Sequence, residues 1–214
     1  MVHIRLSGLD ALPCISNAIT SGYTVSTYAT MPDSKDLPMG VALGPGGTLY
    51  ACGFGGRVWT IAANGSVVLL ANLGGLELRD IVADARGNSY VLTQVNDIRR
   101  ITPGGVVSIF AGGAHSQVDG VGTAAGFAGL QGADIDSAGN IYVGDMISVR
   151  KIDTVGRVTT LYTFTGSNEV LTGIAIDKTH NIYYATPDAV YRIDSLGQNP
   201  TYITWSPLTK TRSG

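Results

Sequence analysis

One ten-residue pattern recurs four times along this chain, and it constrains the fold more than any other feature. The copies are VALGPGGTLY at 41–50, IVADARGNSY at 81–90, ADIDSAGNIY at 133–142 and IAIDKTHNIY at 174–183. Each copy ends on a tyrosine, and the tyrosines lie 40, 52 and 41 residues apart. A site that performs chemistry occurs once, whereas a structural unit recurs, so the pattern indicates a building block.

The register continues beyond each tyrosine. An apolar pair spaced by three residues follows, then a glycine four residues later, then a β-rich segment: SVVLLA, VVSIFA, RVTTLY and TYITWS. The longest spacing is explained by an insertion, residues 111–131. Each copy therefore predicts four short strands separated by turns, and a period of about 40 residues with four strands is typical of a β-propeller blade. We expect an all-β propeller of four or five blades.

The same segments resemble the NHL-repeat propellers. The resemblance is carried by GIAIDKTHNIYYAT, by GADIDSAGNIYVGD with the later VRKIDTVGRVTTL, and by DGVGTAAGF, and it covers about residues 38–205. Two positions depart from the pattern: Gly44 replaces a repeated aspartate, and His180 replaces a turn glycine. The resemblance implies that Phe127 packs between two blades.

The predicted organisation has three parts. Residues 1–36 form an N-terminal segment in which 2–7 and 23–30 have the character of the two outer strands of half a blade. Residues 206–214 form a C-terminal tail. Closure stays open between a five-bladed ring completed by the N-terminal strands, a four-bladed ring, and a ring completed by a partner chain. The four blades between these ends are predicted at 37–75, 76–128, 129–166 and 167–205.

Composition excludes several classes of function. The net charge is −2 and the sequence pI is about 5.8, so no basic face for nucleic acid is predicted. No apolar run approaches the roughly 18 residues of a membrane span. The N-terminus lacks the pattern of a signal peptide. We expect a virion or surface assembly, or otherwise a cytoplasmic protein.

The repeated polar residues have structural interpretations. Asp84, Asp136 and Asp177 precede the turn in three copies, where a short carboxylate can accept backbone N–H groups. The repeated tyrosines are predicted to pack between blades. Cys14 and Cys52 lack the spacing of a metal site, so two free thiols or one disulfide remain possible.

No catalytic residue, metal site or cofactor is predicted. His3, His115 and His180 are scattered along the chain, and no nucleophile elbow, metalloprotease motif or phosphate loop occurs.

Candidate binding residues come from features that the repeat does not explain. Asp134 has no acidic counterpart in the other copies, and the insertion places His115 and Gln117 on a loop, where binding residues often lie. Long side chains on the third strands could cover apolar surface or contact a ligand. The full set of candidates is Asp134, His115, Gln117, Trp59, Arg99 and Arg150.

Three functions follow in order of preference. The first is a non-enzymatic scaffold with a protein partner, a structural or decorating component of a virion or surface appendage, with homo-oligomers possible. The second is a ligand- or glycan-binding, lectin-like propeller with a polar and aromatic cluster on one rim. The third is a metal-dependent enzyme of the lactonase or lyase type, which the resemblance to six-bladed enzymes implies.

Overall fold

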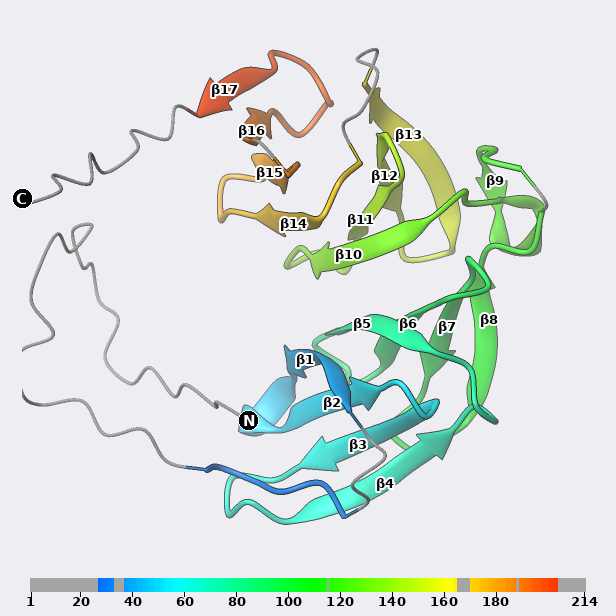
Figure 1. The fold of residues 1–214 in the computed structure, drawn as a ribbon, viewed down its shortest axis with the longest axis vertical. Helices are drawn as coiled ribbons and strands as arrows, with labels where there is room; N and C mark the ends of the chain where they lie inside the picture. Colours follow the sequence, from blue (N-terminus) through cyan, green and yellow to red (C-terminus); the bar gives the residue numbers. More distant parts are fainter. Residues whose placement is uncertain (1–26, 33–36, 115, 165–169, 188, 204–214) are drawn as a thin grey trace, which may run out of the picture.

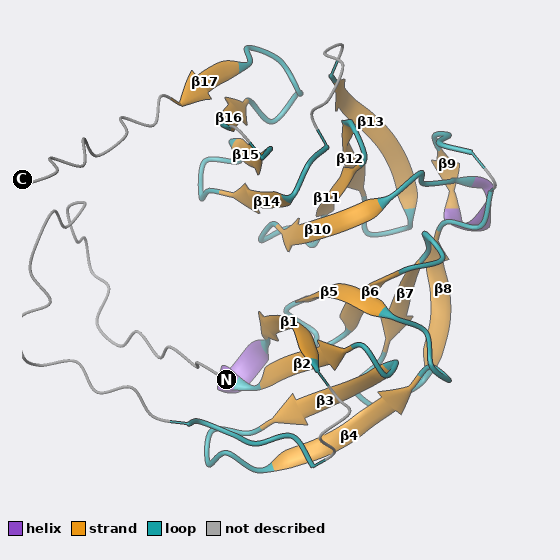
Figure 2. Cartoon of the chain, viewed as in Figure 1, coloured by secondary structure: helices purple, strands orange, loops and turns teal. Residues whose placement is uncertain are grey.

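The computed structural model describes residues 27–32, 37–114, 116–164, 170–187 and 189–203. These residues form four antiparallel sheets, and two short 3-10 helices are the helical pieces among them (Figure 2). The all-β prediction is confirmed. The predicted strand at 2–7, most of the predicted strand at 23–30, and the tail lie outside the described residues.

The first two sheets follow the chain in order, from the innermost strand to the outermost. The first sheet contains β1 (Pro38–Leu43), β2 (Leu49–Gly53), β3 (Arg57–Ile61) and β4 (Val67–Asn72), with the 3-10 turn η1 (Pro45–Gly47) between β1 and β2. The second contains β5 (Leu78–Ala83), β6 (Ser89–Thr93), β7 (Ile98–Ile101) and β8 (Val107–Ala111).

The last two sheets repeat this order, with one addition. The third contains β10 (Leu130–Ile135), β11 (Ile141–Asp145), β12 (Ser148–Ile152) and β13 (Arg157–Thr163), and the fourth contains β14 (Gly173–Ile176), β15 (Ile182–Ala185), β16 (Val190–Ile193) and β17 (Thr201–Ile203). The insertion supplies β9 (Gly120–Val121) and η2 (Gly122–Ala124). Strand β9 pairs with β13, so the third sheet has five strands where four were expected.

The sheets are the blades of a β-propeller, arranged in an arc. The innermost strands β1, β5, β10 and β14 pack against one another in sequence order, and Figure 1 shows them on the concave side of the arc. The outermost strands β4, β8, β13 and β17 lie on its convex side (Figure 1). In the described residues, the first and fourth blades form the two ends of the arc.

Apolar cores fill the three junctions between blades. Tyr50 packs between the first and second blades, Tyr90 between the second and third, and Tyr142 between the third and fourth. Phe127 is buried in the second junction, as the resemblance implied. Because each blade buries both faces only against its neighbours, the junctions supply the hydrophobic stabilisation of the arc.

A glycine in each turn between the third and fourth strands fixes the outer spacing of the blades. Gly105, Gly156 and Gly197 have φ values of 79°, 82° and 75°, in the left-handed region. A Cβ on Gly105 would lie 2.5 Å from Leu70 O, and a Cβ on Gly156 would lie 2.7 Å from Phe110 O. Gly197 meets Leu161 O in the same way. Each turn therefore rests on the outermost strand of the preceding blade.

We predict that Gly105→Ala is more destabilising than Gly74→Ala. Both residues have positive φ, but a Cβ on Gly74 would meet nothing within 4 Å. The control should lose about 1–2 kcal/mol for the left-handed backbone alone. Gly105→Ala should lose about 1–3 kcal/mol more because its methyl group displaces the neighbouring carbonyl. Equal losses in chemical denaturation would show that the turn does not support the preceding blade.

Candidate functional site

Two half-buried carboxylates link the innermost strands on the concave side. Asp80 accepts hydrogen bonds from Ile81 N in its own blade (2.9 Å) and from Ala133 N in the next blade (2.9 Å). Asp134 accepts hydrogen bonds from Ile135 N (2.8 Å) and from Ile176 N in the next blade (2.7 Å). Each carboxylate thus joins two equivalent backbone amides of neighbouring blades.

Asp134 therefore has a counterpart, which the comparison of repeats missed. In register with the aspartates of the turns, Asp80 corresponds to Gly132, while Asp134 corresponds to Val82. The same device is used two residues apart along the strand. Burial raises the pKa of Asp80, an effect that the hydrogen bonds from Ala133 and Ile81 oppose and the charge of Asp134 reinforces.

The repeated aspartates hold the first turn of each blade, as predicted. Asp136 Oδ1 accepts hydrogen bonds from the amides of Ala138 and Asn140, and Oδ2 accepts from the Asn140 side chain (2.8 Å) and from the Tyr142 hydroxyl (3.2 Å). Burial opposes ionisation of Asp136, but these hydrogen bonds outweigh it and keep the pKa of Asp136 below its usual value. The turns at Asp84 and Asp177 are built identically.

The first blade lacks this carboxylate and uses its tyrosine differently. A Cβ on Gly44 would collide with the ring of Tyr50, so the glycine makes room for the ring. The Tyr50 hydroxyl donates to Gly87 O in the turn of the second blade (3.1 Å). The departure at Gly44 thus exchanges a bond within a blade for a bond between blades.

Two of the candidate residues, Gln117 and Arg150, meet at the buried carboxylate of Asp145, beneath the insertion. Arg150 and Asp145 are both fully buried and 2.8 Å apart. Arg150 also donates to Asp119 (2.9 Å), and its guanidinium lies 5.4 Å from the centre of the Phe127 ring. Gln117 donates to Asp145 Oδ2 (2.7 Å).

This cluster fastens the insertion to the third blade. Asp145 also accepts the amides of Ala128 and Gly129, and Asp119 accepts the amide and hydroxyl of Thr160 on β13. Sequence reasoning missed Asp145. Its position at the end of IYVGD, in the strand before the one that carries Arg150, was a usable signal. All polar groups of Asp145 are occupied, which suits anchoring better than ligand binding.

Three of the remaining candidates, Asp134, Trp59 and Arg99, do not join this cluster. Trp59 is buried in the middle of β3, so it is not on a rim. Arg99 pairs with Asp97 at 3.1 Å, within the second blade. His115 lies outside the described residues. The structure therefore brings Gln117 and Arg150 together and leaves Asp134, Trp59 and Arg99 apart from them.

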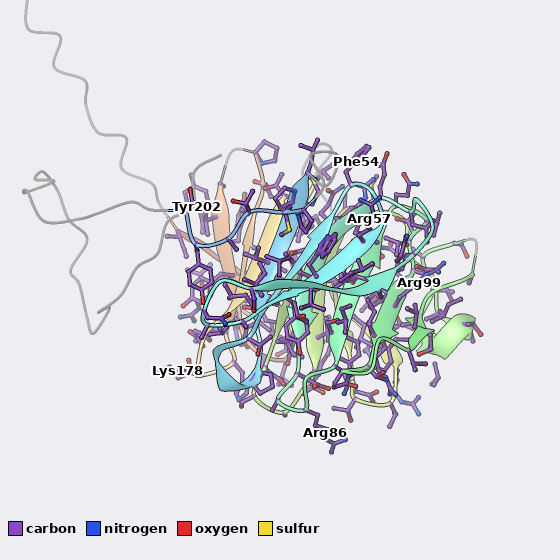
Figure 3. All side chains as sticks on the ribbon, turned by 90° about the horizontal axis from the view of Figure 1, so that it is seen from below. Phe54, Arg57, Arg86, Arg99, Lys178 and Tyr202 are labelled. Carbon is purple, nitrogen blue, oxygen red and sulfur yellow. The ribbon has the colours of Figure 1, made fainter. Side chains whose placement is uncertain are left out.

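One small pocket opens between the third and fourth blades. Its volume is about 210 Å³, and its lining is Ile135, Asp136, Ser137, Ile176, Asp177, Lys178 and His180. Lys178 lies on the same rim as Arg86, opposite the rim of Phe54 (Figure 3). His180 has a φ of 62°, where the second and third blades have glycine, and its Nδ1 lies 3.9 Å from Asp136 Oδ2. The pocket offers carboxylates, an ammonium, an imidazole and a hydroxyl over an apolar floor.

The described residues contain no cluster of three or more side chains that could ligate a metal ion. Cys52 is a free, buried thiol whose pKa is raised to about 12, mainly by burial. Within these ranges, no helix has the length and apolarity needed to cross a membrane.

We predict that Arg150→Met destabilises the protein by about 3–5 kcal/mol, because Asp145 would remain buried without its counter-charge. The matched control is Arg157→Met, since the Arg157 side chain is 63% exposed and its contact with Asp153 is long, at 4.0 Å. That change should stay within about 0.5 kcal/mol of wild type. Chemical denaturation measures both variants, and similar losses would show that the buried pair is not an anchor.

The comparisons with known proteins show the fold. No family model and no curated protein matches the sequence. Among solved structures, virginiamycin B lyase from Staphylococcus aureus matches with a TM-score of 0.66 and 14% identity, over 83% of this chain and 58% of that one.

Two further structures bind partners or ligands according to their descriptions. An auxiliary nutrient binding protein from Bacteroides ovatus matches with a TM-score of 0.60 and 21% identity, over 77% of this chain and 48% of that one. A nidogen/laminin complex matches with a TM-score of 0.64 and 11% identity, over 78% and 65%. The chain thus spans about half to two thirds of the length of these structures, and what they have in common with it is the β-propeller fold.

Proposed function

We propose that this chain is a non-enzymatic β-propeller scaffold of NHL type. We further propose that it binds a partner protein through the face of β1 that points away from the second blade. One observation carries the proposal. Val41 and Leu43 point to the same face of β1 and are 67% and 69% exposed. Among the described residues, no other innermost strand presents comparable apolar surface on this face.

The positions equivalent to Val41 and Leu43 are buried in the second blade and half-buried in the third and fourth. In the second blade, Ile81 corresponds to Val41 and is 2% exposed, while Ala83 corresponds to Leu43 and is 8% exposed. Both pack into the core of the first junction. The face of β1 has the chemistry of a blade junction without its neighbour. Uncovered apolar surface of this kind favours association with another protein.

The use of charge inside the blades supports a scaffold rather than an enzyme. Asp80 and Asp134 join neighbouring strands, Asp136 holds a turn, and Asp145 with Arg150 anchors the insertion. An active site needs groups left free to react with a substrate. The nutrient-binding and laminin-complex neighbours agree with binding, whereas the lyase neighbour keeps the enzymatic alternative in view. No observation supports the virion or appendage role, so it is not part of the proposal.

We predict that the wild-type chain self-associates and that the Leu43→Asp variant does so more weakly, because a charge on this face cannot be buried against a second copy. Sedimentation velocity over a range of concentrations measures the effect. Val155→Asp is the control, since Val155 is 70% exposed in the turn between β12 and β13. A wild-type chain that stays monomeric at every concentration would contradict assembly from copies of this chain.

A second candidate function is the binding of a small polar ligand such as a sugar unit. The pocket between the third and fourth blades favours it, because Ser137, Lys178 and His180 can donate hydrogen bonds above Ile135 and Ile176. His180 adopts a left-handed backbone where glycine is easier to accommodate. An unfavourable conformation retained beside a pocket points to a role for the side chain.

We predict that His180→Gly abolishes any signal of this protein on a glycan array without lowering its stability. The substitution removes the imidazole and relieves the backbone at the same time. Asn199→Gly is the control, because Asn199 also has a positive φ (55°) but does not line the pocket. An array without hits for the wild type would contradict this second function, as would binding that His180→Gly leaves unchanged.

A further inference from the structure

The described N-terminal residues occupy the place of an outermost strand. A Cβ on Gly65, in the turn between β3 and β4, would lie 2.9 Å from Tyr28 O. In the later blades the equivalent glycine meets the outermost strand of the preceding blade, at Leu70, Phe110 or Leu161. The Tyr28 hydroxyl also donates to Ala62 O at 3.2 Å. Tyr28 therefore stands where the outermost strand of a blade before the first would run.

The face of the first blade that points away from the second blade is exposed on its innermost strand and buried on the next two. Val41, Ala51 and Trp59 lie side by side across strands β1, β2 and β3. They are 67%, 0% and 8% exposed. The middle of this face is thus covered, and its innermost strand is bare. In the second blade, both Ile81 and Val91 at the equivalent positions are buried.

A complete blade does not fit this surface. Its outermost strand would occupy the position that the chain at Tyr28 already holds beside Gly65. What remains uncovered is the width of the innermost strand, at Val41 and Leu43. Two inner strands joined by a turn would cover it, as β5 and β6 cover the next blade at the second junction.

From these observations we propose that β1 binds a β-hairpin of the repeat's own inner type, supplied by another polypeptide, which completes a fifth blade. The inference rests on the proposed function and names the chemistry of the partner. It extends an interface that the chain builds three times between its own blades, with inner hairpins that differ in sequence but share one mode of contact.

The existing junctions define what such a hairpin must carry. Its second strand needs a tyrosine, because Tyr50, Tyr90 and Tyr142 each fill the next junction. Its first strand needs a small residue or an aspartate. The amides of Ala133 and Ile176 donate hydrogen bonds to the carboxylates of Asp80 and Asp134. The equivalent amides on β1 are those of Val41 and Leu43. Innermost strands are sheet edges, where an added carboxylate acceptor is favourable.

The chain supplies a suitable probe in the hairpin of β10 and β11. Residues 130–145 carry Asp134 and Tyr142, and Leu130 and Asp145 face each other at its open end. A head-to-tail cyclic peptide of this segment should titrate the full chain to saturation with one-to-one stoichiometry, measured by isothermal titration calorimetry. The substitution Asp134→Asn in the peptide should weaken binding, because an amide offers one acceptor where the carboxylate offers two.

Two variants of the chain and one control locate the binding surface. Val41→Asp and Leu43→Asp should each lower the affinity at least about tenfold, which corresponds to about 1.4 kcal/mol. Val155→Asp, equally exposed elsewhere, should leave the affinity unchanged. Both β1 residues are exposed, so the variants should fold, and a thermal melt checks this. Equal binding by Val41→Asp and Val155→Asp would overturn the proposal.

The remaining outcomes separate this inference from the proposed function. Absence of binding to the wild type overturns the inference, including the case in which residues 1–26 or 204–214 already cover β1. If the wild type does not bind the peptide but self-associates, and Leu43→Asp weakens that self-association, the proposed function stands and the occupant is a second copy. A monomeric chain that binds the hairpin supports the inference and rules out assembly from copies alone.

Discussion

The arc depends on contact between the innermost strands of neighbouring blades. These strands are sheet edges with free backbone groups, so they must be satisfied from outside their own sheet. Asp80 and Asp134 do this with a single carboxylate that accepts one amide from each of two blades. The first junction uses close approach instead, since a Cβ on Gly40 would lie 2.7 Å from Asp80 Oδ1. Each junction is thus closed locally, and the arc needs no further core along its axis.

Much of the fold could be predicted from the sequence because the repeat shows the same solution four times. The turn aspartates are an example: their spacing to the following asparagine and tyrosine fixes a local hydrogen-bond network. Local geometry of this kind needs no knowledge of the neighbouring blade. The fifth strand of the third sheet was not predicted, because Gly120 and Val121 carry no strand pattern and pair only through the position of β13.

The candidate site was harder to predict, for a physical reason. Asp134 was singled out because its register position is not acidic in the other copies, but its counterpart Asp80 is offset by two residues, and a comparison in register cannot find it. Trp59 was expected to be available to a ligand, whereas its position within β3 buries it. Arg150 and Gln117 converge on Asp145 only after the insertion folds back over the blade. Contacts between distant segments do not follow from spacing alone.

The anchored insertion has a consequence for engineering this repeat. Residues 112–129 lengthen one connection between blades, yet the strands on either side keep the geometry of the repeat. The added segment is tied to the third blade by Asp145 and Asp119, and its Ala125 and Phe127 are part of the apolar core of the second junction. A foreign loop grafted between Gly112 and Ala128 would keep that tether only if it retained Asp119, and it would also need Ala125 and Phe127 to fill the junction core. The short connection at 73–77 is held instead by backbone hydrogen bonds, from Leu73 N to Gly56 O and from Gln94 N to Glu77 O, which a graft there would have to preserve.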